Sequence, residues 1–195
     1  MTQRPTDRQQ LRRPSAPIAA DGEAIDYHAG GQDWLVTWHP GALPPPSGTR
    51  HGSAAVCLTA DGQVVLVSAD GESWDLPGGR PEGDEDWRAT PDREVFEEAC
   101  ATVEQATLLG YSRGICTRGP EEGLVLVRSL WRAIVVIHDW EPQYEISHRL
   151  LAPPTSALSQ LAPEVCQPIY RRWFQEALTE LKSRWFTSLP TYAHP

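Results

Sequence analysis

The chain is 195 residues long, which fits one domain better than two because domains typically contain about 100 to 200 residues. Its formal net charge is −9, which argues against a nonspecific grip on a nucleic-acid backbone, since such binding needs a basic face. The longest uninterrupted apolar runs, 54–58 and 133–137, are far shorter than the roughly 20 residues that cross a bilayer. We therefore expect neither a polymeric nucleic acid nor a membrane as a partner.

Cysteine usage and the N-terminal segment bear on location and domain limits. The four cysteines are widely spaced and show no Cys-x-x-Cys pattern, so we expect reduced, mostly buried thiols and a cytoplasmic protein. No apolar segment of a secretory signal follows the first basic residues. Residues 1–25, rich in Pro, Gln and Arg, are expected to form a flexible tail ahead of a single domain over 26–190.

The pattern of β-strands is clearest in the first half of the chain. Alternating apolar residues predict a strand over 33–38, with Trp34, Val36 and Trp38 on one face. The runs 54–59 and 63–68 are joined by Ala60-Asp61-Gly62, which predicts a hairpin because Asp-Gly tolerates the positive φ of a tight turn. Further strands are predicted over 74–76, 107–115, 124–137 and 145–151.

Two helices are predicted. The first runs from Pro91 to about Ala101, with Thr90 as its N-cap and Pro91 at the first helical position. We expect its apolar face to pack inward; this face contains Val95, Phe96, Ala99 and Cys100. The second is a long C-terminal helix that docks on the core through Ile169, Trp173, Ala177, Leu181 and Trp185, with Phe174 and Leu178 beside them.

The first helix carries an unusual acidic face. Glu94, Glu97 and Glu98 stand at positions i, i+3 and i+4, so their carboxylates project from one side and repel one another. A hard divalent cation such as Mg²⁺, which prefers carboxylate oxygen, would relieve that repulsion. The alternative is a solvated acidic helix face, which is what most charge runs are.

The spacing of the surrounding residues favours the metal site. Gly79 is followed after five residues by Glu85, and Glu85 after seven by Arg93. With the helix carboxylates, the chain reads G-x5-E-x7-R-E-U-x-E-E, where U is the aliphatic Val95. This pattern resembles the signature of the Nudix hydrolase family.

The resemblance has one departure. The family pattern continues x-G-U, and this chain has Cys100 and Ala101 at the last two positions. Glycine lets a helix end in a left-handed turn, a conformation that costs other residues about 1 kcal/mol or more. Either the helix runs on, or Cys100 adopts that conformation.

The resemblance implies a fold and a set of roles. The fold is an α/β/α sandwich in which the helix of the Nudix box and the long C-terminal helix flank a mixed β-sheet. The implied divalent-metal ligands are Glu94, Glu97, Glu98 and the carbonyl oxygen of Gly78. Arg93 and Glu85 match a pair that orients the loop and the helix. A further acidic residue from a later loop is expected to assist, with Glu145 as first choice and Glu141 as second.

The implied reaction is the hydrolysis of a diphosphate linkage in a nucleoside diphosphate joined to another group. Mg²⁺ is the expected cofactor, with Mn²⁺ as a substitute, and Glu94 is the candidate base. One alternative is a Nudix-like module that binds a nucleotide without turnover. Another is an enzyme that acts on an unusual diphosphate, such as an isoprenoid or a sugar nucleotide, which the sequence does not separate from an enzyme that acts on nucleoside triphosphates. The resemblance also allows a homodimer.

Substrate choice is left open by the sequence. The proline that would indicate ADP-ribose is replaced by Cys116, and 117–119 lack the tyrosine that would indicate diadenosine polyphosphates. A nucleobase could stack on one of four tryptophans, Trp34, Trp38, Trp74 or Trp87. For each of them, packing within the protein is the simpler interpretation. We expect the scattered His51, His138 and His148 to satisfy local hydrogen bonds.

Overall fold

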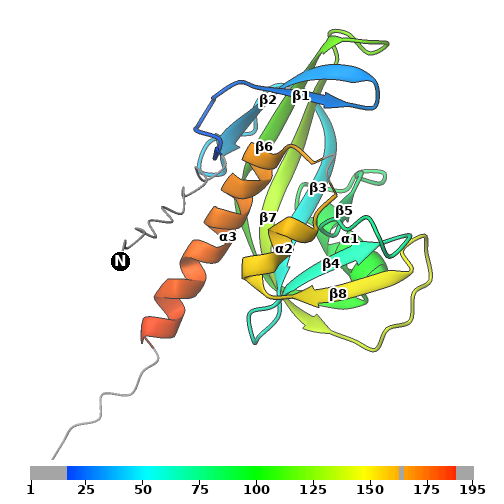
Figure 1. The fold of residues 1–195 in the computed structure, drawn as a ribbon, viewed down its shortest axis with the longest axis vertical. Helices are drawn as coiled ribbons and strands as arrows, with labels where there is room; N and C mark the ends of the chain where they lie inside the picture. Colours follow the sequence, from blue (N-terminus) through cyan, green and yellow to red (C-terminus); the bar gives the residue numbers. More distant parts are fainter. Residues whose placement is uncertain (1–16, 163–164, 188–195) are drawn as a thin grey trace, which may run out of the picture.

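The computed structural model describes residues 17–162 and 165–187, which form one mixed β-sheet and three helices (Figure 1). The strands are β1 (Ile25–Ala29), β2 (Gln32–Pro40), β3 (Thr49–Leu58), β4 (Val64–Ser68), β5 (Gly78–Gly79), β6 (Ala101–Arg118), β7 (Val125–Ile137) and β8 (His148–Ala152). The helices are α1 (Ala89–Ala99), α2 (Pro154–Gln160) and α3 (Gln167–Thr187). Within these described residues, no helix combines the length and the apolar character needed to cross a membrane.

The sheet has the strand order β1-β2-β6-β7-β3-β4-β8, and the short β5 pairs with β3. The pair β3–β7 is parallel, whereas the other pairs are antiparallel. The register of β3 shifts between Arg50 and Gly52, so that one extra residue, His51, bulges opposite β7.

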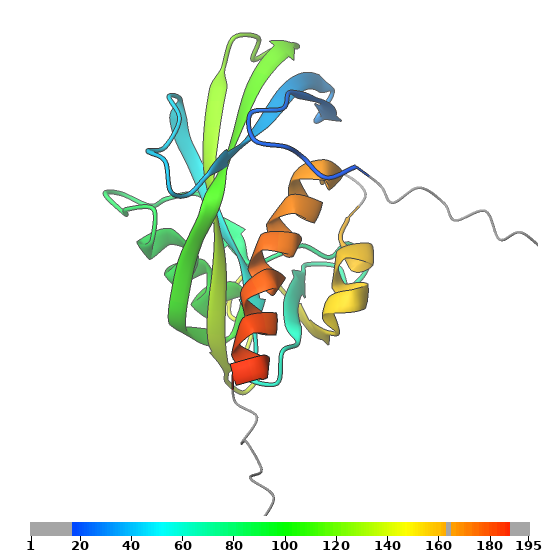
Figure 2. The same ribbon diagram turned by 90° about the vertical axis from the view of Figure 1, so that its left-hand side faces the viewer.

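Helices cover both faces of the sheet (Figure 2). Along β3, Val56 and Leu58 join the core under α3, whereas Ala55 and Cys57 join the core under α1. This alternation is the period-two pattern of a strand that is buried on both faces. The predicted α/β/α sandwich with a mixed sheet is therefore confirmed.

The long C-terminal helix docks as predicted. Ile169, Trp173, Phe174 and Ala177 are buried in the core that α3 shares with the sheet. The side chain of Trp173 is fully buried, and its Nε1 donates a hydrogen bond of 2.8 Å to the Trp131 carbonyl oxygen on β7. The side chains of Leu181 and Trp185, which complete the predicted stripe, lie outside the described residues.

The predicted hairpin between β3 and β4 is present. Thr59 and Gln63 close it through a backbone hydrogen bond of 2.9 Å, and Gly62 has a φ of 83°. The turn thus uses glycine where the backbone takes a conformation that other residues rarely adopt.

Several predicted boundaries are wrong. The segment 74–76 makes only isolated bridges, from Trp74 to Leu161 and from Asp75 to Val67. The strand expected over 107–115 extends from Ala101 to Arg118, because β6 pairs with β2 along one edge and with β7 along the other. The last strand begins at His148 rather than at Glu145. The strands β1 and β5 and the helix α2 were not predicted from the sequence.

The start of the described chain also differs from the expected tail. Within the mostly exposed segment 17–24, Ala19 is buried against α3 and its backbone N–H donates a hydrogen bond of 3.1 Å to the Pro168 carbonyl oxygen. Asp21 pairs with Arg172 of α3 at 3.1 Å. These contacts supply the apolar burial and the ion pair that the composition of the segment did not suggest. The remainder of the expected tail, 1–16, lies outside the described residues.

Candidate active site

Helix α1 presents the acidic face that the sequence predicts. Val95 and Ala99 are fully buried against the sheet, which fixes the rotation of the helix. Glu94, Glu97 and Glu98 therefore lie along one side of it. The expectation that Phe96 packs inward is wrong, because its side chain is 62% exposed.

The start of α1 is held by an aspartate rather than by the predicted threonine cap. Asp86 Oδ1 accepts hydrogen bonds from the backbone N–H groups of Arg88 and Ala89, each 2.8 Å long. The helix begins at Ala89, so Thr90 lies inside it and donates its hydroxyl to Glu85 Oε2 at 3.0 Å. The Asp86 side chain satisfies backbone donors of the first turn, which is what an N-cap does.

Arg93 ties the loop before α1 to the helix. Its Nε donates to Glu85 Oε1 at 2.8 Å, its Nη1 to Glu97 Oε2 at 2.9 Å, and its Nη2 to the carbonyl oxygen of Arg80 at 2.9 Å. The hydrogen bonds from Arg93 lower the pKa of Glu85 to about 2, and the same carboxylate raises the pKa of Arg93. The predicted pair of Arg93 and Glu85 is thus in direct contact.

Glu98 reaches back from α1 to the β5 backbone. Its Oε2 accepts a hydrogen bond of 2.8 Å from the Gly78 N–H. Burial raises the pKa of Glu98 to about 8, and the carboxylates of Glu94, Glu145 and Asp75 add to that rise, whereas the Gly78 N–H opposes it. Such a carboxyl group would be far easier to ionise beside a cation.

Glu94 is the most buried carboxylate of the helix, with 8% of the residue exposed. Burial raises its pKa, the nearby Arg93 guanidinium opposes the rise, and the charges of Glu97 and Glu145 add to it. Its Oε1 lies 3.1 Å from Arg93 Nη2. The helix thus places two carboxylates with raised pKa values, Glu94 and Glu98, one turn apart.

The two glycines of β5 make room for these side chains. A Cβ atom on Gly79 would lie 2.0 Å from Glu94 Oε1, and a Cβ on Gly78 would lie 2.3 Å from the Cβ of Ala54. At Gly78 the clash also involves the backbone of Ser53 and Ala54, so glycine is required there, whereas a Cβ at Gly79 would displace the Glu94 carboxylate. The contact between Gly79 and Glu94 gives a physical reason for the glycine of the motif.

The loop between β7 and β8 brings further acidic residues to the site. Glu145 contributes to the raised pKa values of Glu94 and Glu98, which places its charge toward the helix carboxylates. Glu141 lies with Glu97 and Cys100 around a neighbouring solvent-open hollow. The loop thus brings both acidic candidates, Glu145 and Glu141, to α1. Glu145 acts on the raised-pKa carboxylates Glu94 and Glu98, whereas Glu141 lies near Glu97.

The end of α1 resolves the departure from the Nudix pattern. The helix stops at Ala99, and Cys100 adopts the left-handed conformation, with φ 45° and ψ 55°. Arg149 from β8 donates to the carbonyl oxygens of Ala99 and Cys100, at 2.7 and 3.1 Å. A cation thus satisfies the last carbonyls of the helix, where the helix dipole is negative. Arg149 could not be predicted as a partner of this helix end because it is distant along the chain.

Most of the candidate base-stacking tryptophans have packing roles instead. Trp38 is buried in the core under α3, and Trp34 and Trp74 pack against that core. Trp87 makes an edge contact with Tyr111, with ring centroids 5.6 Å apart, and lies beneath Arg50. Hence Trp38 is excluded as an exposed stacking platform, and the other three rings already have partners within the protein.

The oxygen-rich donor set of this site suits a hard cation. Among the described residues, no group of three or more His, Cys, Asp or Glu side chains is arranged so that it could hold a metal ion as it stands. Glu94 and Glu97 both contact Arg93, and Glu98 binds the Gly78 N–H. Buried carboxylates with raised pKa values on one helix face are nevertheless the donors that Mg²⁺ prefers, and a cation would offset their repulsion.

Comparison with known proteins agrees with this geometry. The family model described as NUDIX domain matches residues 49–183. Among solved structures, a variant of the Bacillus subtilis pyrophosphohydrolase BsRppH superposes with a TM-score of 0.57 at 18% identity, covering 82% of this chain and 97% of that one. The mutator MutT protein from Bacillus halodurans gives a TM-score of 0.50 at 19% identity, covering 66% and 81% of the two chains. No curated protein matches the sequence.

The matched region spans more than half of the chain and contains the whole acidic helix with the loop before it. The chain therefore belongs to the Nudix hydrolase family. The structural neighbours, at less than 25% identity, share its fold.

Proposed function

We propose that this protein is a divalent-metal-dependent pyrophosphohydrolase that cleaves a diphosphate linkage in a nucleoside diphosphate joined to another group. The observation that carries the proposal is the placement of Glu94, Glu97 and Glu98 on one face of α1, with Glu98 held against Gly78. The name of the Bacillus subtilis neighbour, a pyrophosphohydrolase, supports the same reaction class. Small nucleotides are the proposed ligands, and the homodimer and the cytoplasmic location stay predictions.

The residues proposed to hold the metal surround the β5 edge. Glu98, Glu94, Glu97 and Glu145 would supply carboxylate oxygens to Mg²⁺, or to Mn²⁺ as a substitute. The Gly78 carbonyl oxygen would add a backbone ligand, because the N–H and C=O of one residue in a strand point to the same side and this N–H points to Glu98. A bound divalent cation would polarise the phosphate oxygens and lower the pKa of a water molecule.

The remaining steps are assigned to the protein's own groups. The carboxylate of Glu94 is proposed to accept the proton of the attacking water, whose oxygen forms the new bond to phosphorus as the bridging P–O bond breaks. Arg93 neutralises part of the negative charge of the α1 carboxylates and forms an ion pair with Glu97. This pairing would hold the carboxylates in position when no substrate is bound. Glu85 fixes the Arg93 guanidinium through two contacts, at 2.8 and 3.3 Å.

A hydrolysis screen tests the proposal. Nucleoside triphosphates, ADP-ribose, nucleotide sugars and dinucleotides are incubated with the full chain and Mg²⁺, with Glu98→Gln as the test variant. Glu104→Gln is the matched control, since Glu104 is an exposed glutamate on β6. We expect turnover that requires Mg²⁺, survives Glu104→Gln and is lost in Glu98→Gln. Absence of turnover with a nucleotide that still raises the melting temperature would overturn the proposal in favour of a binding module.

A further inference from the structure

A hollow lies between α2 and the first turns of α3, which stand side by side on the face of the sheet opposite α1 (Figure 1). It has a volume of about 240 Å³ and opens to solvent. We call it the α2–α3 hollow, and it is lined by Thr155, Leu158, Ser159, Leu161, Gln167 and Arg171. The sheet separates it from the acidic face of α1, so it is distinct from the candidate active site.

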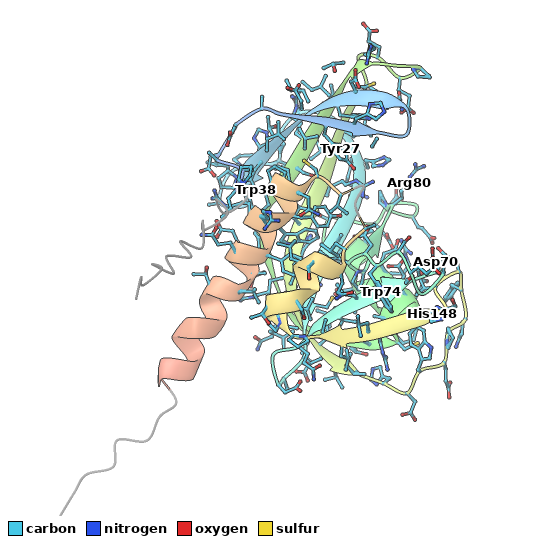
Figure 3. The ribbon with its side chains drawn as sticks, viewed as in Figure 1. Tyr27, Trp38, Asp70, Trp74, Arg80 and His148 are labelled. Carbon is cyan, nitrogen blue, oxygen red and sulfur yellow. The ribbon has the colours of Figure 1, made fainter. Side chains whose placement is uncertain are left out.

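The walls of the α2–α3 hollow are fixed by the core. Ala157 of α2 is fully buried, and it belongs to the same core as Ile169 of α3. Just after α2, Leu161 forms a bridge with Trp74, and the Ala162 N–H donates a hydrogen bond of 2.8 Å to the Trp74 carbonyl oxygen. Figure 3 shows Trp74 beside α2. The hollow is therefore formed in the protein without a ligand.

Arg171 brings an unsatisfied donor to this hollow. Its Nε is buried without a hydrogen-bond partner, and no other buried side-chain nitrogen or oxygen of the described residues lacks one. Within 17–162 and 165–187, its guanidinium group has neither a hydrogen bond nor an ion pair. The neighbouring Arg172, in contrast, pairs with both Asp21 and Glu176. A buried donor left unpaired is costly and rare in native proteins, and an anion bound at Arg171 would satisfy it.

The polar rim of the α2–α3 hollow also suits an anion. The side chains of Thr155 and Gln167 can donate hydrogen bonds, and neither has a partner among the described residues. Ser159 is engaged, because its hydroxyl donates to the Ser156 carbonyl oxygen at 2.7 Å. The long helix α3 begins at Gln167 and has no acidic residue in its first turn. The positive end of its dipole therefore adds to the attraction for a negative charge.

The remaining wall of the hollow is apolar. Leu161 is buried, and the half-buried Leu158 packs against the same core. A ligand that fits this site therefore combines one anionic group with a short apolar body. The volume of 240 Å³ is smaller than the roughly 300–1,000 Å³ of pockets for drug-sized molecules, and it corresponds to about eight water molecules of about 30 Å³ each. The ligand is therefore limited to roughly eight non-hydrogen atoms.

We propose that the α2–α3 hollow binds a small aliphatic monocarboxylate. Its carboxylate group contacts Arg171, and its hydrocarbon chain lies against Leu158 and Leu161. The planar guanidinium matches the two oxygens of a carboxylate, and one guanidinium neutralises one negative charge. A phosphate dianion would keep a charge that no second cation of the hollow offsets. This site goes beyond the proposed hydrolysis and does not depend on it.

An NMR titration that observes the ligand tests the proposal, with hexanoate as a probe of the right size. The full chain is kept in EDTA, so that no divalent cation binds the carboxylate. We expect saturable binding to the native chain and at least tenfold weaker binding to Arg171→Gln, which loses the charge-assisted contact. The uncharged hexanamide should bind the native chain at least tenfold more weakly than hexanoate. Arg118→Gln removes a different arginine, one that pairs with Asp33, and should bind hexanoate as the native chain does.

A second variant tests the site without removing Arg171. Ser159→Asp places a carboxylate on the exposed rim of the hollow, where it competes for the guanidinium, and it should weaken hexanoate binding at least tenfold. Circular dichroism verifies that each variant is folded. Equal binding by the native chain and Arg171→Gln, or no saturable binding to the native chain, would overturn the proposal. Tighter binding of inorganic phosphate than of hexanoate would overturn the choice of a carboxylate.

The active-site variant Glu98→Gln separates this site from the proposed function. It should bind hexanoate as tightly as the native chain, because Glu98 lies on the other side of the sheet. Loss of hexanoate binding in Glu98→Gln would place the ligand at the acidic face of α1 and overturn the proposal. If no nucleotide is hydrolysed, the proposed function fails while the titration still decides the α2–α3 hollow.

Discussion

Replacing Cys100 with glycine should stabilise the protein. Cys100 ends α1 in the left-handed conformation, with φ 45° and ψ 55°, which costs a residue with a Cβ about 1–2 kcal/mol. Glycine avoids that cost but gains about 0.4–1 kcal/mol of entropy in the unfolded chain. The difference predicts that Cys100→Gly raises the free energy of unfolding by about 0.5–1 kcal/mol.

The assay is thermal and denaturant unfolding of three proteins. For a domain of this size the gain corresponds to a rise in Tm of about 1–4 °C. Cys100→Ala is the matched control, because alanine removes the thiol and keeps the Cβ that causes the strain. We expect no stabilisation from alanine. If glycine and alanine give the same stability, or glycine lowers it, then the backbone strain assigned to Cys100 is wrong.

Three further predictions concern the site and the core. Gly79→Ala should lower kcat/KM about 100-fold in steady-state assays, because its Cβ would meet Glu94 Oε1 at 2.0 Å and displace that carboxylate. Glu85→Gln should reduce the free energy of unfolding more at pH 7 than at pH 3, measured with urea. Arg93 lowers the pKa of Glu85 from 4.5 to about 2. The ionised Glu85 therefore stabilises the folded state fully above pH 4.5, and this stabilisation is lost as the pH falls toward 2. Trp173→Ala should cost about 3–5 kcal/mol in denaturant unfolding, because the side chain is fully buried.

Each of these predictions has an outcome that would contradict it. Unchanged kinetics in Gly79→Ala would mean that Glu94 can move without loss of activity. If the difference in the free energy of unfolding between the native chain and Glu85→Gln is as large at pH 3 as at pH 7, the ion pair between Glu85 and Arg93 is not the cause of that difference. For Trp173, the comparison is Phe96→Ala, which removes an exposed aromatic ring and should cost less than about 0.5 kcal/mol.

Local patterns in the sequence predicted the parts of the fold that depend on nearby residues. The i, i+3, i+4 spacing sufficed to place three carboxylates on one helix face, and the Asp61-Gly62 turn sufficed for the β3–β4 hairpin. The spacing of Glu85 and Arg93 led to the family that the domain match confirms. In each case the relevant interaction spans only a few residues or follows a fixed motif.

Contacts between distant segments could not be predicted in this way. Arg149 caps the end of α1 from β8, and Ala19 packs against α3 from the segment assigned to a flexible tail. Phe96, expected to pack inward, instead lines a solvent-open hollow together with residues of the loop between β7 and β8. Such features follow from tertiary packing, which overrides local propensity.

Whether the acidic face of α1 binds a metal can be decided by titrating Mn²⁺ into the native chain, Glu98→Gln and Glu104→Gln and following the loss of the paramagnetic resonance signal of free Mn²⁺. We expect the native chain and Glu104→Gln to bind the ion equally and Glu98→Gln to bind it at least tenfold more weakly. Equal Mn²⁺ binding by all three proteins would contradict the assignment of the acidic face of α1 as the metal site.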